Sequence, residues 1–379
     1  MLKKLCLLTM MTLVSLSLTG CWDRTDIERY AFILGIGIDK GEKDGIVVTY
    51  QIALPQGIMA AGQGGGGGES TVEIKVDAVN KKNADQKLLS KTNQIPNYSH
   101  LQVIVFGEKL SKEGIREHLD FFLREPEMRH LTKVLISRGD SEKVFKVKPK
   151  NGDSTSQYIS EMLEQTQRFS LSVPKYVDLG MLQRKLAHPS DLLLSKVSKI
   201  DDMLSVEGGA VVKEDKFIGW IDSKQAIGYK LLEDNVNWGV IDISIGADKK
   251  DRVSFQIIGS QTKVQPMLKP KEKKFIFSVK LTIEGDVVEV GQDMFKAFDA
   301  NFVKNVEKQA ENEVENLYLG VFEKLQKSFK ADALGLCEVV ANHYPTFWDK
   351  HKHEWKEYFL RSELKLNVDV SVRRIGLIK

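Results

Sequence analysis

Paired runs of alternating apolar and polar residues recur along this chain and favour folds built on antiparallel strands. Apolar side chains occupy every second position in residues 32–38 and again in 46–54, on either side of the polar turn 40–45. Residues 209–212 and 217–221 form a second pair around a short polar turn. A period of two predicts a strand with one buried face, and two such runs around a turn predict a hairpin. Further strands are predicted at residues 101–106, 134–136, 241–245, 253–257, 275–283 and 364–372, with a turn at 284–286 leading into 287–290.

A helical pattern dominates the C-terminal third. Apolar residues lie three or four positions apart from Phe295 to Phe329, which predicts an amphipathic helix of about 50 Å with a bend near Gly320. Shorter helices are expected over residues 77–94, after a cap at Ser111, after Ser154 and over 223–232. The predicted fold class is therefore α+β, with mixed, largely antiparallel sheets covered by helices.

Two composition changes divide the chain into three expected domains. Residues 196–202 are polar, and Pro266, Pro270 and a lysine-rich run to Lys274 interrupt the strand pattern. The expected units are an N-terminal α+β domain (21–198), a middle α+β domain (199–265) and a C-terminal α+β domain (266–379).

Residues 1–20 have the pattern of a secretory leader. Lys3 and Lys4 precede a largely apolar stretch at residues 5–18, which is shorter than the ~20 residues that span a bilayer as a helix. The stretch ends in Leu18-Thr19-Gly20-Cys21, which resembles the bacterial lipobox. We expect cleavage after Gly20 and lipid attachment to Cys21, as diacylglycerol on sulfur and an acyl chain on nitrogen. The alternatives are an ordinary secretory cleavage site with a chance cysteine and an uncleaved anchor.

Charge and cysteine content exclude several classes of protein. The 55 Lys and Arg residues nearly balance the 52 Asp and Glu residues, so there is no basic stripe for nucleic acid. Cys6 lies in the leader and Cys21 is assigned to lipid, which leaves Cys337 alone, without a disulfide partner or a zinc pair. Cys337 is predicted to be a small buried hydrophobe.

The Gly35-x-Gly37 pattern is assigned to a strand, and the five-glycine run 64–68 to a flexible loop tip.

One polar cluster near the C-terminus has residue types that can bind metal. It comprises His343, His351, His353, Glu354 and Glu357. The segment also carries Trp348, Trp355 and Phe359 at helical spacing, so a helix packed through its aromatics is favoured over a metal site or a membrane-interface helix. His100 is expected to be a hydrogen-bonded structural histidine, and residues 124–127 to be a helix end with a solvated charge run. We expect no cofactor, no metal and no catalytic centre, because no nucleophile, zinc, phosphate-loop or calcium motif is present.

Fragments spread over the whole mature chain resemble one family. They are residues 20–24, 36–39, 100–101, 103–108, 114–115, 119–127, 209–212, 219–221 and 374–376, together with Asp332, Gly335, Tyr344, Pro345, Trp348 and Trp355. Their order and spacing resemble the lipoprotein C subunit of bacterial spore nutrient germinant receptors (the Ger(x)C family). Cys337 departs from that pattern, because the family usually has a second glycine after Gly335.

This resemblance implies a non-enzymatic receptor subunit with three mixed α/β domains. It implies lipid attachment at Cys21, a place at the outer face of the spore inner membrane, and the membrane A and B subunits as partners. Two rival functions share the anchor: a solute-binding lipoprotein of a transporter, which needs two lobes of repeated βαβ units, and an envelope hydrolase, which needs a catalytic constellation.

Overall fold

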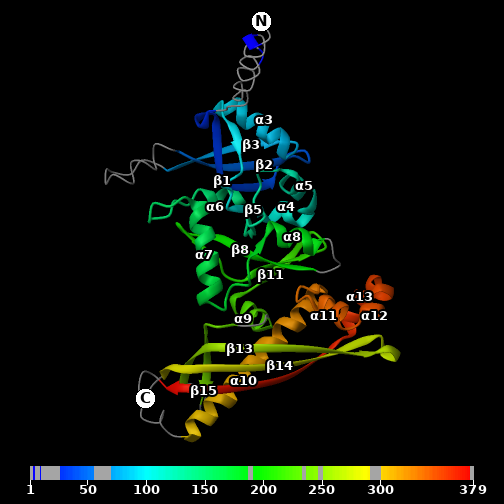
Figure 1. The fold of residues 1–379 in the computed structure, drawn as a ribbon. Helices are drawn as coiled ribbons and strands as arrows, with labels where there is room; N and C mark the ends of the chain where they lie inside the picture. Colours follow the sequence, from blue (N-terminus) through cyan, green and yellow to red (C-terminus); the bar gives the residue numbers. More distant parts are fainter. Residues whose placement is uncertain are drawn as a thin grey trace.

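The computed structural model describes Lys3, Lys4, Thr9 and residues 26–54, 70–186, 191–232, 236–245, 251–290 and 300–375. These residues build two sheets with helices packed against them, drawn one above the other in Figure 1. We call them the upper sheet and the lower sheet. The mixed α+β fold predicted from the sequence is confirmed, including the long helix near the C-terminus.

The upper sheet runs in the order β11-β10-β8-β6-β5-β1-β2-β3, with β4, β7 and β9 paired to β1, β6 and β8. Its strands are β1 (Tyr30–Lys40), β2 (Ile46–Ala53), β3 (Thr71–Ala78), β4 (Ile95–Asn97), β5 (Val103–Gly107), β6 (Lys133–Ser137), β7 (Val177–Asp178), β8 (Leu192–Ile200), β9 (Met203–Ser205), β10 (Gly209–Lys213) and β11 (Lys216–Ile221). The hairpins β1–β2 and β10–β11 are antiparallel as predicted. The centre differs, because β1, β5, β6 and β8 pair in parallel.

Helices cover both faces of the upper sheet. They are α3 (Lys81–Thr92), α4 (Glu108–Glu113), α5 (Arg116–Arg124), α6 (Ser141–Phe145), α7 (Thr155–Phe169) and α8 (Leu179–Leu186), with a short 3₁₀ turn η1 (Ile27–Arg29) before β1. Side chains of α3, α5 and α8 pack on the face that carries Ile104 and Phe106. Side chains of α6 and α7 pack on the face that carries Val103 and Val105. Because β5 is buried on both faces, its sequence is a continuous apolar run.

Two helix starts differ from the sequence prediction. Ser111 lies inside α4, where its hydroxyl donates to the Gly107 carbonyl at 2.9 Å, and it caps no helix. The next helix, α5, begins only after Gly114, which has a φ of 141°. The polar helix expected at 77–94 begins at Lys81, because β3 continues to Ala78 and the Asn80 side chain accepts from the Asn83 amide. The helix predicted to open at residues 152–154 is confirmed as α7, and the Ser154 side chain caps it by accepting from the Gln157 amide.

The lower sheet runs in the order β12-β13-β14-β15. Its strands are β12 (Gly239–Ile245), β13 (Asp251–Lys269), β14 (Lys274–Val290) and β15 (Glu363–Ile375), with the 3₁₀ turn η2 (Pro270–Glu272) joining β13 to β14. The helices are α9 (Ser223–Leu232), α10 (Ala300–Glu323), the π-helical turn η4 (Lys324–Phe329), α11 (Leu336–His343), α12 (Pro345–His351), the 3₁₀ turn η5 (Lys352–Glu354) and α13 (Trp355–Arg361). Helix α10 crosses one face of this sheet (Figure 1), and its Val306, Ala310 and Val314 pack in the core there.

Strand β14 corrects the turn predicted at residues 284–286. It is one strand of 17 residues, and Gly285 pairs with Ile257 and Val372 on either side. A Cβ at Gly285 would lie 2.4 Å from the Gln256 carbonyl oxygen and 2.4 Å from the Phe255 ring. Glycine therefore permits a close approach of two strands here and does not reverse the chain.

The long amphipathic helix is confirmed in its central part. Phe295 and Phe298 lie outside the described residues. The α-helix continues through Gly320, where we expected a bend, and changes to π geometry at Lys324.

The expected domain boundaries fall within strands. The boundary at 198/199 lies inside β8, and β10 and β11 extend the same upper sheet. The boundary at 265/266 lies inside β13, and residues 270–274 form the tip of the β13–β14 hairpin. Residues 199–265 thus contribute strands to both sheets.

Candidate functional site

The expected lipid site lies outside the described residues. Gly20 and Cys21 belong to that part of the chain, as does the glycine run 64–68. Among the residues that the structure does describe, no helix is both long and apolar enough to cross a bilayer.

The polar cluster near the C-terminus does not assemble around a common point. His351 Nδ1 lies 2.9 Å from Glu354 Oε1, and the His351 ring stacks on Phe347. Glu354 also pairs with Lys273 at 3.2 Å, and His343 Nδ1 lies 2.9 Å from the Val339 carbonyl oxygen. Within the described ranges, no group of three or more His, Cys, Asp or Glu side chains could hold a metal ion.

We expected a single helix in this segment. The structure instead has three short helical elements, α12, η5 and α13. Packing through aromatic side chains is confirmed, because Trp355, Tyr358 and Phe359 are buried against β14. The Trp348 and Trp355 rings make a T-shaped contact at 5.7 Å.

The other two positions lie beside the upper sheet, His100 before β5 and residues 124–127 at the end of α5. The His100 ring is exposed and makes an edge contact with Phe32 at 5.6 Å. Helix α5 ends at Arg124, as predicted, and the Arg124 guanidinium pairs with Asp120 one turn earlier.

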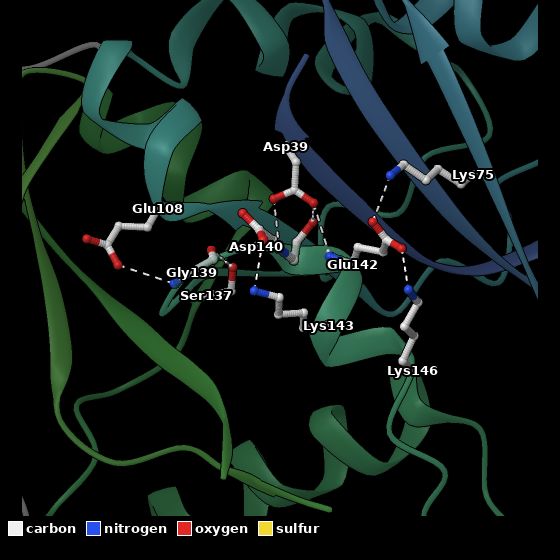
Figure 2. Close-up of polar contacts among 10 residues, drawn as sticks. Asp39, Lys75, Glu108, Ser137, Gly139, Asp140, Glu142, Lys143 and Lys146 are labelled. Carbon is white, nitrogen blue, oxygen red and sulfur yellow. Dashed lines mark hydrogen bonds and ion pairs between the residues drawn. The ribbon is translucent and has the colours of Figure 1, made fainter. Parts of the chain in front are cut away.

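Two of the fragments that resemble the receptor C-subunit family, residues 36–39 and 103–108, lie next to each other at the start of α6. Figure 2 shows the Asp39 carboxylate pointing at this helix end. Asp39 Oδ1 accepts from the Ser141 amide at 2.7 Å, and Asp39 Oδ2 accepts from the Ser141 hydroxyl at 2.8 Å and the Glu142 amide at 3.0 Å. Burial raises the pKa of Asp39, and these hydrogen bonds oppose the rise. Asp39 therefore joins β1 to α6 as a buried helix cap.

Two neighbours of Asp39 complete this arrangement. Glu108 accepts from the Gly139 amide at 3.2 Å and so holds the loop that leads into α6 (Figure 2). Gly107 leaves space for the carboxylate, because a Cβ there would lie 1.9 Å from Asp39 Oδ1.

Replacing Gly107 with alanine is expected to lower the free energy of unfolding by about 1–3 kcal/mol, the usual cost of overpacking a core. Denaturant unfolding of the purified protein measures it. Gly320→Ala is the matched control, since nothing lies within 4 Å of its Cβ position and alanine favours a helix by up to about 1 kcal/mol. An unchanged stability of Gly107→Ala would show that Asp39 can move aside without loss.

A second buried carboxylate organises the C-terminal helices. Asp332 accepts from the amides of Leu336 and Cys337, at 3.0 and 2.8 Å, and from the indole N–H of Trp355 at 3.0 Å. Burial raises the pKa of Asp332 to about 6. Cys337 is buried as predicted, and burial raises the pKa of its thiol. The fragment residues Asp332 and Trp355 thus fix α11 against α13.

The same region joins the two sheets. Asp191, just before β8, accepts from the Glu214 amide at 3.0 Å and from the Asp332 amide at 2.9 Å. The Lys213 ammonium donates to the Lys330 carbonyl at 2.9 Å. The edge of the upper sheet is therefore hydrogen-bonded to the segment between η4 and α11.

Sequence reasoning missed a buried ion pair in α3. Lys81 is 4% exposed and donates to Asp85 at 2.5 Å and to the Tyr98 hydroxyl at 2.6 Å. The Tyr50 and Tyr98 hydroxyls also donate to Asp85. The Lys81 ammonium lies 4.4 Å from the ring centre of Phe121. Burial lowers the pKa of Lys81 to about 8, against the attraction of Asp85. The sequence feature that could have indicated this ion pair is the spacing of four residues between Lys81 and Asp85, within an otherwise polar segment.

Comparison with known proteins identifies the family. The family model described as "Spore germination protein N-terminal domain" matches residues 23–199, and the one described as "Spore germination B3/ GerAC like, C-terminal" matches residues 207–376.

Similar relatives come from Bacillus subtilis (strain 168). Spore germination protein A3 is 28% identical over 97% of this chain and 96% of its own length. Spore germination protein YndF is 26% identical over 100% of this chain and 98% of its own length, and spore germination protein B3 is 24% identical over 98% of each.

The crystal structure of the GerBC protein superposes with a TM-score of 0.60 at 22% identity, over 92% of this chain and 100% of that one. This likeness establishes a shared fold. From the family models and the relatives, we conclude that the chain belongs to the GerAC family of spore germination proteins and is a spore germination receptor subunit.

Proposed function

We propose that this protein is the lipid-anchored C subunit of a spore nutrient germinant receptor and acts by assembling with the membrane A and B subunits. The observation that carries the proposal is the extent of the family match, which begins two residues after Cys21 and ends at residue 376. The lipobox-like Leu18-Thr19-Gly20-Cys21 directly before that match supports the anchor.

The described geometry favours binding over catalysis. The fragment residues Asp39, Asp332 and Trp355 are used in internal hydrogen bonds, which hold helices in place. Their role in this fold is to hold α6, α11 and α13 in position.

A lipid tether suits such a subunit. Two acyl chains, at about 0.8 kcal/mol per buried CH₂, give stable membrane attachment where a single chain gives marginal binding. Confinement to the membrane raises the effective concentration of the subunit at its partners. Modest contacts with the A and B subunits then suffice for assembly.

A Cys21→Ala strain tests the proposal. We expect the protein to leave the membrane fraction or to remain unprocessed, and germination with the nutrients of its own receptor to fall as in a deletion strain. The measurements are membrane fractionation and the loss of optical density of spores after nutrient addition, in a background without other nutrient receptors.

Non-nutrient triggers serve as the control and should still germinate both strains. Full membrane retention of Cys21→Ala in the absence of the A and B subunits would contradict the anchor. A deletion strain that responds normally to every nutrient would contradict the receptor assignment and favour the solute-binding function.

A further inference from the structure

A cleft of about 780 Å³ lies where the edge of the upper sheet meets the C-terminal helices. One wall comes from the start of α5 and the β10–β11 turn, and the other from residues 330–332, α12, η5 and α13. In Figure 1 this is the region between β11 and the helices α11–α13. Its volume is in the range of small-molecule sites.

Five cationic side chains line the cleft from both walls: Arg116, Lys213, Lys330, Lys352 and Lys356. None of them forms an ion pair with another side chain in the described part of the chain. Arg116 donates to the Leu186 carbonyl at 3.3 Å, and Lys213 donates to the Lys330 carbonyl at 2.9 Å. Lys213 and Lys356 lie close enough that the charge of Lys356 lowers the pKa of Lys213, after the larger effect of burial.

Four acidic residues, Asp191, Glu214, Asp332 and Asp349, share the lining with these cations and offset part of the charge, and Asp191 and Glu214 attract Lys213. Asp191 and Asp332 direct their carboxylates at main-chain amides and the Trp355 indole, and burial raises the pKa of both. Glu214 and Asp349 are the exposed acids among the lining residues. Converging cations at one cleft repel each other unless an anion lies between them.

We propose that this cleft binds a small polyanion from solution, with at least two phosphate or carboxylate groups. Four of the five cations are lysines, whose ammonium groups act as point charges and accept either kind of group, whereas an arginine fork favours one geometry. The cations lie on two walls of the cleft. A ligand with two or more separated negative groups can contact both walls, whereas a monovalent anion cannot.

Position favours a soluble ligand over a lipid headgroup. The cleft lies at the β11 edge of the upper sheet, whereas the described chain starts beside β1 and β4, several strands away. Neighbouring strands are about 4.8 Å apart, which puts the two regions roughly 20 Å or more from each other. The choice of a soluble ligand over a lipid headgroup rests on the proposed lipid anchor, whereas the anion site itself depends neither on the anchor nor on the receptor partners.

The experiment is calorimetric titration of the full-length protein in non-ionic detergent with pyrophosphate and with citrate, at constant ionic strength. We expect saturable binding of at least one of them, weakened at least tenfold in the Lys352→Gln/Lys356→Gln double variant, whose side chains are exposed. Lys280→Gln/Lys365→Gln is the matched control, because these exposed lysines lie on β14 and β15 outside the cleft.

Three results would overturn the proposal. One is the absence of saturable binding by either anion. Another is an equal loss of affinity in the cleft and control variants, which would indicate a general charge effect. The third is binding to phosphatidylglycerol vesicles without binding to the soluble anions, which would assign the site to a membrane headgroup.

Discussion

Replacing Lys81 with alanine is expected to lower the free energy of unfolding by about 3–5 kcal/mol, the cost of removing one partner from a buried ion pair. Asp85 would lose its cationic partner in a buried position and retain the hydroxyls of Tyr50 and Tyr98 as donors. The ammonium also packs against the Phe121 ring, so its loss leaves a gap between α3 and α5. Denaturant unfolding measures the loss.

Lys82→Ala is the matched control, since Lys82 is the next residue of the same helix and is exposed. Its stability should stay within about 0.5 kcal/mol of the wild type. Equal effects of the two substitutions would mean that the buried pair contributes no more than a surface lysine.

Stability is also expected to depend on the ionisation of Asp332. Burial raises its pKa from the ordinary 3.8 of an aspartate to about 6 in the folded protein, so the folded state binds more protons between these two values. Its contribution is thus fully present below about pH 4 and is lost as the pH rises through 6. The difference of about two units corresponds to about 3 kcal/mol.

The measurement compares the free energy of unfolding of the wild type and Asp332→Asn from pH 4 to pH 7.5. The wild type should lose about 3 kcal/mol relative to the variant over this range. Asp349→Asn, which removes an exposed carboxylate of the same region, is the control and should keep the wild-type slope. Parallel profiles of the wild type and Asp332→Asn would contradict an unfavourable buried charge at position 332.

The sequence predicted most strands because one buried face leaves a period of two. Strand β12 shows this plainly, with Ile241, Ile243 and Ile245 buried in alternation. It did not predict the parallel centre of the upper sheet, because β5 and β6 are short and buried on both faces. Such runs carry no period that tells a parallel neighbour from an antiparallel one.

The polar side chains of the candidate sites were harder to predict. The carboxylates of Asp39 and Asp332 accept hydrogen bonds from main-chain amides of other elements. For Asp39 the partner, Ser141, lies 102 residues later, and nothing in the local sequence indicates that its carboxylate faces a helix start there. Lys81 and Asp85 lie in a segment whose composition is that of a solvated helix. Burial there follows from the position of α3 against β2 and α5, which only the tertiary structure defines.

The lower sheet is complete only when the last described strand, β15, has paired with β14. Strand β15 pairs in parallel with β14, and the helices from α10 to α13 lie between them along the chain. A chain that ends before Glu363 would leave the 17 residues of β14 as an open edge, the kind of surface that pairs with other chains and aggregates. During synthesis, the residues of β15 (Glu363–Ile375) must therefore leave the ribosome before this sheet can close. Termination of the chain before Glu363 should yield an insoluble product and not a partly active one.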